Sequence, residues 1–281
     1  MEKGKKIAVL SGKGGTGKTL VSVNLAALER DCLYVDCDVE EPNGHLFFKP
    51  EIRKKFDVKV KIPKINNALC NGCKKCVRFC RFNALAFTKQ VIVFNEVCHS
   101  CGGCVMVCQQ KAITETDKGV GVIEMGCSGQ VKTLTGKMNV GEASGVPIIK
   151  ELLKLTDDYP CSVFIDCPPG SACVVMESIK DADYCILVAE PTLFGAHNLE
   201  MVYELVRLFG KPFGAVLNKC TAGYNPSEEF CRKHSIEILE KIPYDKDLGE
   251  LTSEGRVAVR EKFSGKDIFY SLLSKVKEVV K

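Results

Sequence analysis

Residues 11–19 read Ser-Gly-Lys-Gly-Gly-Thr-Gly-Lys-Thr, and this stretch decides the fold. It follows the apolar run Ile7 to Leu10 and precedes the apolar segment Leu20 to Leu28. A glycine-rich turn between a strand and a helix points backbone N–H groups at phosphate oxygens, and the spacing Gly-x4-Gly-Lys-Thr is that of a P-loop. The sequence therefore predicts a nucleotide site formed by Gly12, Lys13, Gly14, Gly15, Thr16, Gly17, Lys18 and Thr19.

Lys18 and Thr19 have defined roles in such a loop. The lysine of a P-loop reaches the β- and γ-phosphates of the nucleotide, and the hydroxyl that follows it is a ligand of Mg²⁺. The alternative is an ordinary glycine-rich turn with two solvated lysines. The strand before the loop and the helical segment after it favour the nucleotide site, because the motif requires both.

The composition is that of an ordinary globular chain. Of its 281 residues, 46% are apolar and 26% are charged. No run of about 18 apolar residues occurs, and the first residues lead into a strand without the hydrophobic region of a signal peptide. We therefore expect a cytoplasmic protein. A net charge of +4 is too small to argue for a nucleic-acid partner.

Eight of the 17 cysteines form an internal repeat. The two runs are Cys70-x2-Cys73-x2-Cys76-x3-Cys80 and Cys98-x2-Cys101-x2-Cys104-x3-Cys108, whose corresponding residue numbers differ by 28. Such self-similarity indicates two copies of one structural unit. In a cytoplasmic chain, regularly spaced cysteines are better explained as metal ligands than as disulfides.

The cysteine spacing is typical of bacterial ferredoxins that carry two [4Fe-4S] clusters. In these proteins the first three thiolates of a run hold one cluster, and the fourth ligates the other. The first cluster should bind Cys70, Cys73, Cys76 and Cys108, and the second should bind Cys98, Cys101, Cys104 and Cys80. Arg81 and Gln109 stand where the motif usually has proline, which affects the loop rather than the ligands. Two zinc sites are the alternative, because paired Cys-x2-Cys motifs also bind zinc.

Aspartates end two further apolar runs. Asp36 and Asp38 follow Leu33 to Val35, and Asp166 ends a run that starts at Cys161. Carboxylates at the C-terminal tips of strands beside a P-loop can act on Mg²⁺ or on the attacking water. We therefore expect a magnesium site formed by Thr19, Asp36, Asp38 and Asp166. For Asp36 and Asp38 the alternative is a capped acidic turn.

The loop with its early lysine, Lys13, resembles the deviant P-loop of the MinD/ParA-type ATPases, which include the nitrogenase iron protein. The resemblance implies that the chain works as a homodimer in which Lys13 reaches the nucleotide of the other subunit. It also implies a catalytic set of Lys13, Lys18 and Asp38, in which Asp38 orients or activates the water. Asp36 would support Asp38, and Asp166 would hold Mg²⁺ through water.

The same resemblance implies contacts at the base of the nucleotide. In this family an asparagine and a proline-containing loop line the adenine, and the matching residues are Asn218, Pro243 and Asp245. Thr221 stands where a guanine-specific motif has aspartate, so ATP is favoured over GTP.

The expected fold is α/β, with a mostly parallel P-loop NTPase sheet and helices on both faces. Residues 1–56 and 118–281 should form this ATPase domain, and residues 57–117 a small inserted α+β domain like a bacterial ferredoxin. Apolar runs predict strands at 120–125, 161–166, 184–189 and 213–217, and apolar periodicity predicts helices at 142–155, 196–209 and 266–281. The last helix should close the core rather than grip a membrane.

Together these features resemble MinD-superfamily ATPases that contain an inserted ferredoxin domain. The resemblance implies ATP hydrolysis by a nucleotide-driven homodimer, coupled to electron transfer through two [4Fe-4S] clusters to a redox or iron-sulfur partner protein. One alternative is an ATPase for iron-sulfur or metal-cofactor assembly. A second is a MinD-like membrane-positioning ATPase. The nine cysteines outside the repeat should be mostly buried small hydrophobes.

Overall fold

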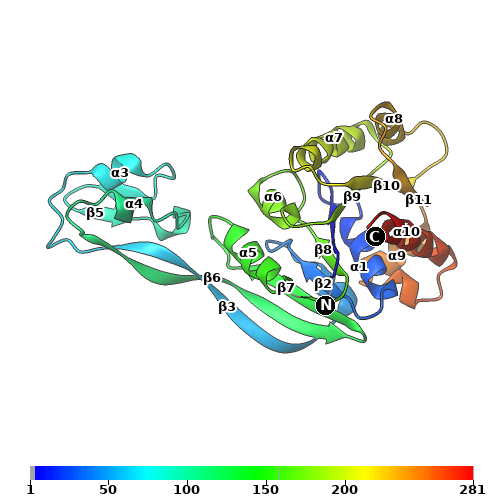
Figure 1. Cartoon of the computed structure of the whole chain (residues 1–281), viewed down its shortest axis with the longest axis horizontal. Coiled ribbons are helices and arrows are strands. Elements are labelled where there is room, and N and C mark those ends of the chain that lie inside the picture. Colours follow the sequence, from blue (N-terminus) through cyan, green and yellow to red (C-terminus); the bar gives the residue numbers. More distant parts are fainter. Residues whose placement is uncertain (1–3, 158, 281) are drawn as a thin grey trace.

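A nine-stranded sheet organises the chain (Figure 1), as seen in the computed structural model, which describes residues 4–157 and 159–280. The strand order is β11-β10-β9-β1-β8-β2-β7-β6-β3. The pairs from β11 to β7 are parallel, whereas β6 and β3 add an antiparallel edge. This confirms the expected α/β fold with a mostly parallel sheet.

Strands and helices alternate along the chain in the parallel part of the sheet. The strands are β1 Lys6–Leu10, β2 Leu33–Asp36, β7 Val131–Met138, β8 Val163–Asp166, β9 Tyr184–Ala189, β10 Phe213–Cys220 and β11 Ile238–Pro243. The helices are α1 Lys18–Leu28, α2 Gly44–Phe48, α5 Val146–Lys154, α6 Cys173–Ile179, α7 Leu193–Leu208, α8 Pro226–Lys233, α9 Lys246–Ser253 and α10 Asp267–Val279. Parallel strands need long crossover connections, and here helices provide them.

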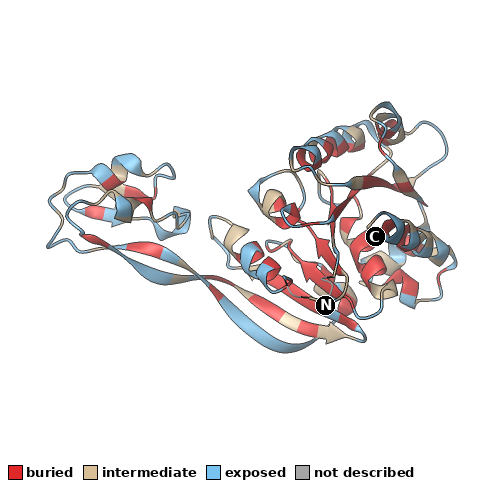
Figure 2. Cartoon of the chain, viewed as in Figure 1, coloured by how far each residue is buried: buried red, intermediate tan, exposed pale blue. Residues whose placement is uncertain are grey.

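Strand β1 shows that the sheet is covered on both faces. Ala8 and Leu10 lie in one apolar cluster with side chains of α5, α6 and α7, whereas Ile7 and Val9 lie in a second cluster with side chains of α1 and α10. Successive residues of a strand point to opposite faces, so a strand buried on both faces is apolar at every position. Buried residues accordingly fill the central strands in Figure 2.

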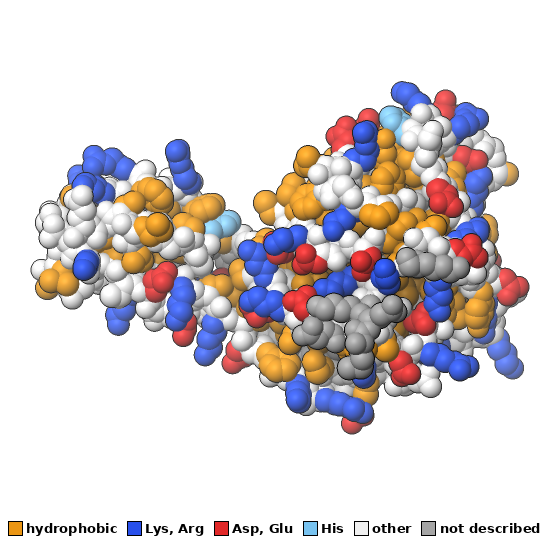
Figure 3. All heavy atoms as spheres, in the orientation of Figure 1, with side chains coloured by type: hydrophobic (Ala, Val, Ile, Leu, Met, Phe, Trp, Pro, Cys, Tyr) orange, Lys and Arg blue, Asp and Glu red, His pale blue; other side chains and the backbone are white. Residues whose placement is uncertain are grey.

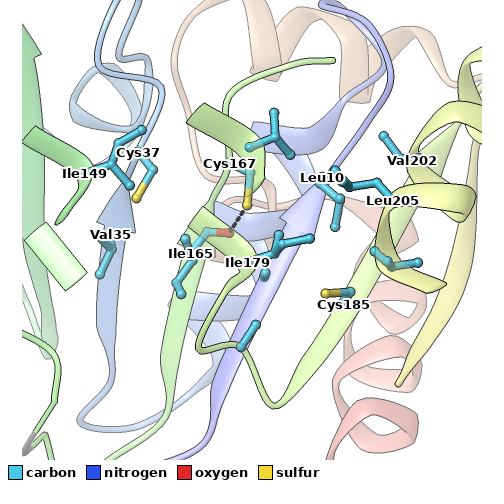
Figure 4. Close-up of a cluster of buried hydrophobic side chains, with 14 of the residues drawn as sticks. Leu10, Val35, Cys37, Ile149, Ile165, Cys167, Ile179, Cys185, Val202 and Leu205 are labelled. Carbon is cyan, nitrogen blue, oxygen red and sulfur yellow. Dashed lines mark hydrogen bonds between the residues drawn. The ribbon is translucent and has the colours of Figure 1, made fainter. Parts of the chain in front are cut away.

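Several cysteines outside the repeat belong to this core. Figure 4 shows Cys37, Cys167 and Cys185 packed among apolar side chains such as Leu10 and Ile165. Burial raises the pKa of the Cys185 thiol to about 12, so it stays protonated. The expectation of buried cysteines is confirmed for these three and for Cys32 and Cys231. It is wrong for Cys173, which is exposed, and only partly met by Cys127, Cys161 and Cys220, which are half-buried.

A long antiparallel ribbon forms the far edge of the sheet. It consists of β3 (Glu51–Ile65) and β6 (Ile113–Ser128). β6 pairs with β7 only from Gly121 onward, so the earlier residues of β6 pair with β3 alone. The expected domain boundaries, after residue 56 and before residue 118, fall inside these two strands. The ribbon therefore continues the ATPase sheet into the insertion without a break.

The cysteine lobe, residues 66–112, lies at the free end of this ribbon (Figure 1). Its elements are α3 Lys75–Phe79, β4 Leu85–Phe87, β5 Val91–Val93, the short helix η1 Asn95–Val97 and α4 Gly103–Met106. Leu85 and Val91 pack with Cys76 and with Ile113 of the ribbon in a separate small core. The lobe thus has its own apolar centre, to which cysteines of the repeat contribute.

Two expectations for the segment between the ribbon and α5 need correction. The helix expected at 142–155 begins only at Val146, and Pro147 occupies its first turn, where the missing N–H of proline costs nothing. Residues 131–138, for which no element was expected, form β7. The strand expected at 120–125 is part of the much longer β6.

Helix α10 closes the core, as expected. Phe269, Leu272 and Val276 are fully buried in the cluster that also contains α1. The apolar face of this helix is therefore used inside the fold. Lys281, the last residue of the expected helix, lies outside the described residues.

We expect Phe269→Ala to lower the free energy of unfolding by about 3–5 kcal/mol, because it opens a cavity at a fully buried aromatic site. Urea denaturation followed by circular dichroism measures this loss. Tyr270→Ala is the matched control on the same helix, since Tyr270 is 54% exposed, and it should change stability by less than about 1 kcal/mol. Equal losses in both variants would contradict the packing of α10.

Candidate functional site

The P-loop lines a cavity of about 830 Å³ at the C-terminal end of β1. The glycine-rich turn lies between β1 and α1, as the motif requires. The lining residues are Ser11, Lys13–Leu20, Asp38–Glu41, Asn43, Leu46, Phe47, Lys49, Pro168, Pro169, Ala172, Val174 and Thr252–Gly255. The predicted loop residues thus meet the acidic segment after β2 and the proline segment after β8 in one cavity.

Lys18 joins the P-loop to the predicted acidic residues. Its ammonium lies 2.7 Å from a carboxylate oxygen of Asp166 and 3.8 Å from one of Asp38. Burial alone would lower the pKa of Lys18, but the adjoining carboxylates, Asp166 above all, raise it. Burial also raises the pKa of Asp38 to about 6, although Lys18 opposes the shift. Lys18 therefore stays protonated, and Asp38 is mostly ionised at neutral pH.

Asp36 and Tyr34 are buried residues that contact Asp38 and Asp166. Asp36 is fully buried, and its carboxylate accepts hydrogen bonds from the backbone N–H groups of Gly44 at 2.8 Å and Asp38 at 3.2 Å. Burial and the nearby Asp166 carboxylate raise its pKa. The Tyr34 hydroxyl donates to Asp166 at 2.9 Å. Sequence reasoning missed Tyr34, because a buried strand residue gives no sign that its hydroxyl meets an aspartate.

Lys13 is bound by a residue of its own chain in this structure. Its ammonium lies 2.6 Å from Glu190, and Lys219 lies 2.6 Å from the other oxygen of the same carboxylate. Lys219 also donates to the carbonyl of Gly15 at 2.8 Å. Burial opposes ionisation of Glu190, but the two lysines hold its pKa below the usual value. Glu190 therefore fixes the two lysines beside the P-loop.

Asn218 is hydrogen-bonded to the P-loop. Its amide donates to the carbonyl of Thr16 at 2.7 Å, and a Cβ on Gly17 would lie 2.0 Å from that amide nitrogen. Gly12 also packs closely, since a Cβ there would lie 2.1 Å from the carbonyl oxygen of Asn198. Asn218 and Asn198, neither of which lines the cavity, therefore support the loop from outside it.

The residues expected at the adenine do not line this cavity, and their contact with the base stays a prediction. Asn218, Pro243 and Asp245 are described residues, and they lie outside the lining of the cavity. Asp245 caps α9, accepting from the N–H of Leu248 at 2.9 Å. The last residues of α9 and the two residues that follow it, Thr252–Gly255, line the cavity together with Leu46 and Phe47. No recognised motif marks these residues, and only the fold brings them to the P-loop.

The two cysteine runs line two separate hollows in the cysteine lobe. The first hollow is lined by Cys70, Cys73, Cys76 and Cys108. The second is lined by Cys80, Cys98, Cys101 and Cys104. Each hollow therefore combines three close cysteines of one run with the last cysteine of the other, which is the grouping that the sequence predicts. Apolar side chains such as Val91 and Leu85 complete the walls.

The backbone of the two runs repeats as well. Left-handed residues occur at Gly72 and Ser100, at Lys74 and Gly102, and at Asn83 and Lys111, each pair 28 positions apart. Short helices begin at equivalent positions, Lys75 and Gly103. Left-handed residues next to helical ones turn successive N–H groups inward and form concavities that suit anions, including many Fe–S sites.

The sequence of residues 7–259 matches the family described as the CobQ/CobB/MinD/ParA nucleotide binding domain. The chain belongs to this family. Together with the P-loop at its cavity, this makes the protein a MinD/ParA-family P-loop ATPase.

This ATPase is similar in sequence to an uncharacterized protein and in fold to several solved structures. An uncharacterized protein of Methanocaldococcus jannaschii is 32% identical over 280 residues, covering 98% of this chain and 97% of the relative. The septum site-determining protein MinD of Pyrococcus horikoshii, solved with Mg-ADP, superposes with a TM-score of 0.61 at 21% identity, over 98% of this chain and 96% of MinD. MinD in a MinC:MinD complex of Aquifex aeolicus gives 0.58 at 17% identity, over 98% and 96%. These structures show the shared fold.

Thr19, Asp38 and Asp166 carry the oxygens that would be available to a magnesium ion at this cavity. Thr19 and Asp38 line the cavity, and Lys18 links Asp38 to Asp166. Within residues 4–157 and 159–280, no three His, Cys, Asp or Glu side chains are grouped closely enough to hold one metal ion. Mg²⁺ usually takes only one or two carboxylates, with nucleotide phosphates and water completing its shell. The donor set therefore fits Mg²⁺ that arrives with a nucleotide.

Each hollow offers four thiols, the number of ligands that either a zinc ion or a [4Fe-4S] cluster takes. A zinc site needs four ligands at about 2.3 Å from one point, and no three cysteine, histidine or acidic side chains of the described residues converge in that way. In an iron-sulfur cube each thiolate approaches its own iron, so the four sulfurs stand apart around a hollow.

Proposed function

We propose that this ATPase couples ATP binding and hydrolysis to electron transfer through two [4Fe-4S] clusters in the cysteine lobe. The proposal depends on one observation: a single chain contains a P-loop cavity and two hollows, each lined by four cysteines. Four thiolates per site are the usual ligand set of a [4Fe-4S] cluster. The acceptor would be a redox or iron-sulfur protein.

Two subunits would close around two ATP molecules in this mechanism. Lys13 would leave Glu190 and reach the nucleotide bound to the other subunit, where its positive charge would stabilise the phosphates. Lys18 would leave Asp166 and bind the phosphates of its own subunit. Thr19 and Asp166 would hold Mg²⁺, which neutralises phosphate charge, while Asp38 orients the attacking water.

The lobe supports electron transfer more than delivery of a cluster to another protein. Cys76 is buried, and Cys70, Cys80, Cys98, Cys104 and Cys108 are half-buried, so only Cys73 and Cys101 are exposed. Buried ligands retain a cluster, whereas an assembly ATPase needs ligands that an acceptor can displace. The proposal therefore favours resident clusters over clusters in transit.

The test is an anaerobic measurement of cluster oxidation in the presence of nucleotide. Purified protein should contain about eight iron and eight sulfide per chain. With the clusters reduced, a non-hydrolysable ATP analogue should change their reduction potential, or the rate of electron transfer to an external acceptor, relative to ADP. Absence of sulfide would remove the cluster proposal, and identical potentials and rates with both nucleotides would remove the coupling.

A positioning ATPase is the second candidate, and the comparisons taken alone favour it. The solved structures of similar fold include MinD and a Cyanothece McdA bound to ATP, the latter at a TM-score of 0.56 and 13% identity. The described residues contain no helix that is long and apolar enough to cross a membrane. The apolar face of α10 is buried in the core, which argues against membrane binding through this helix. The two cysteine quartets favour the redox function. ATP-dependent sedimentation with liposomes, in protein free of iron, would support the positioning function.

A further inference from the structure

Residues 139–145, which we call the joint loop, connect β7 to α5. The loop contacts the segment after β2 on one side. On the other side it contacts the ribbon and, through one lysine, the lobe. These contacts form a continuous route from Asp38 to the second cysteine quartet.

The first part of the route begins at Val39, directly after Asp38. Val39 is buried, and its carbonyl accepts a hydrogen bond from the N–H of Met138, at the end of β7, at 2.8 Å. A Cβ on Gly145 would lie only 2.4 Å from a methyl group of Val39. The Val39 side chain therefore packs closely against the backbone at the end of the joint loop. Close-packed contacts of this kind transmit displacement, because no free volume absorbs it.

The second part of the route is made by Lys118, on the part of β6 that pairs only with β3. Its ammonium lies 2.7 Å from Glu142 of the joint loop. The same ammonium donates to the carbonyl of Asn95 in the lobe at 2.9 Å. Asn95 begins the short helix that ends just before Cys98, a member of the second quartet. One side chain thus joins the ATPase body to the lobe.

The setting of this contact differs from that of an ordinary surface ion pair. The Lys118 and Glu142 side chains are only 20% and 12% exposed. The neighbouring ribbon pair, Lys61 with Asp117, is 60% and 54% exposed and lies at 2.8 Å. Shielding from water and salt strengthens an ion pair with good geometry, whereas an exposed pair contributes little free energy. Lys118 is therefore placed to hold the lobe, and Lys61 is a matched control.

We propose that Lys118 is a positioning residue that ties the cysteine lobe to the nucleotide state of the Asp38–Val39 segment. When nucleotide draws Asp38 and Val39 to a new position, β7 and the joint loop follow, and Lys118 carries the shift to Asn95 and the second quartet. The inference rests on the proposed function for its purpose, the gating of electron transfer. The mechanical link itself does not require the clusters to be redox-active.

The experiment measures amide hydrogen exchange in residues 92–98 of the anaerobically purified full chain, with ADP and with a non-hydrolysable ATP analogue. In the unaltered chain we expect exchange rates to differ by at least about fivefold between the two nucleotides, the lower end of typical allosteric coupling. In Lys118→Met the difference should fall below about twofold. Lys118→Arg should restore it, and Lys61→Met should leave it unchanged.

Three further readouts separate a positioning role from a structural one. ATP hydrolysis by Lys118→Met should stay within about twofold of the unaltered rate, because Lys118 lies outside the nucleotide cavity. Glu142→Gln breaks the same ion pair from the other side and should reproduce the loss, which guards against misfolding of one variant. The nucleotide-dependent change in cluster oxidation should disappear in both variants.

The outcomes distinguish this inference from the proposed function. If Lys118→Met and Glu142→Gln keep the full difference in exchange between nucleotides, the link through Lys118 is wrong, whatever the clusters do. The inference is also overturned if amide exchange in residues 92–98 of the unaltered chain is the same with both nucleotides. If exchange responds to nucleotide through Lys118 but cluster oxidation does not, the link stands and the proposed redox coupling fails.

Discussion

Asp38→Asn should lower the steady-state rate of ATP hydrolysis by about 10²-fold or more, the usual range for loss of a group that accepts a proton or orients the attacking water. The Asp38 side chain lies at the cavity wall, 3.8 Å from the ammonium of Lys18 and 17% exposed. With a pKa of about 6, it is mostly ionised at neutral pH and can accept a hydrogen bond from water. The amide keeps the shape of the side chain but cannot accept a proton.

The same substitution should leave ATP binding within about threefold, because the amide removes little of the ground-state binding energy. Release of inorganic phosphate measures turnover, and equilibrium binding of a fluorescent ATP analogue measures affinity. Because the ATP-bound state would persist, light scattering should show Asp38→Asn as a dimer with ATP and a monomer with ADP. Glu40→Gln is the matched control, as an exposed neighbour in the same cavity wall. Normal hydrolysis by Asp38→Asn would exclude its proposed role.

Substitution of Cys108 should damage the same iron-sulfur cluster as substitution of Cys76, although the two residues lie 32 positions apart in the sequence. Both line the first hollow. Cys80→Ala should likewise match Cys104→Ala, because those residues line the second hollow. Each substitution should cost up to about four of the eight iron atoms and remove the EPR signal of one cluster.

The grouping of the EPR spectra is the decisive result for the cysteine lobe. Cys76→Ala and Cys108→Ala should share one residual spectrum, and Cys80→Ala and Cys104→Ala should share the other. Cys173→Ala is the control, because Cys173 is exposed and lies outside both quartets, and it should retain all iron. If Cys108→Ala instead resembles Cys104→Ala, each run would bind its own cluster, and the crossed arrangement would be wrong.

Local sequence signals predicted the parts of the site that lie within short stretches. The P-loop residues and the cysteine spacing carry their geometry in consecutive positions, so the cavity and the two hollows follow from them. The role of the acidic segment after β2 was also predictable, since parallel strands end at one edge of the sheet. Asp38 does line the cavity beside the P-loop.

Features that depend on distant pairing were not predicted. Strand β3 joins β6 over a register that pairs Asp57 with Val122, and no local signal specifies such a partner. Alternation of Val58 and Val60 with Lys59 and Lys61 was nevertheless a strand signal that could have been used. The contacts of Lys118 with the joint loop and of Tyr34 with Asp166 arise only in the folded chain. The end of α9 in the cavity wall was not predicted either, and the adenine contacts expected at Asn218, Pro243 and Asp245 stay a prediction.

The outer part of the ribbon is long enough to amplify a rotation of the sheet. Beyond Gly121, eight residues of β6, 113–120, extend without support from β7, which at about 3.3 Å per residue amounts to an arm of about 26 Å. An angular change of about 20° at its base would carry the tip through about 9 Å. A rotation of about 5° in the sheet would therefore move the tip, and with it the cysteine lobe, by about 2 Å, and rates of electron tunnelling change steeply over such distances.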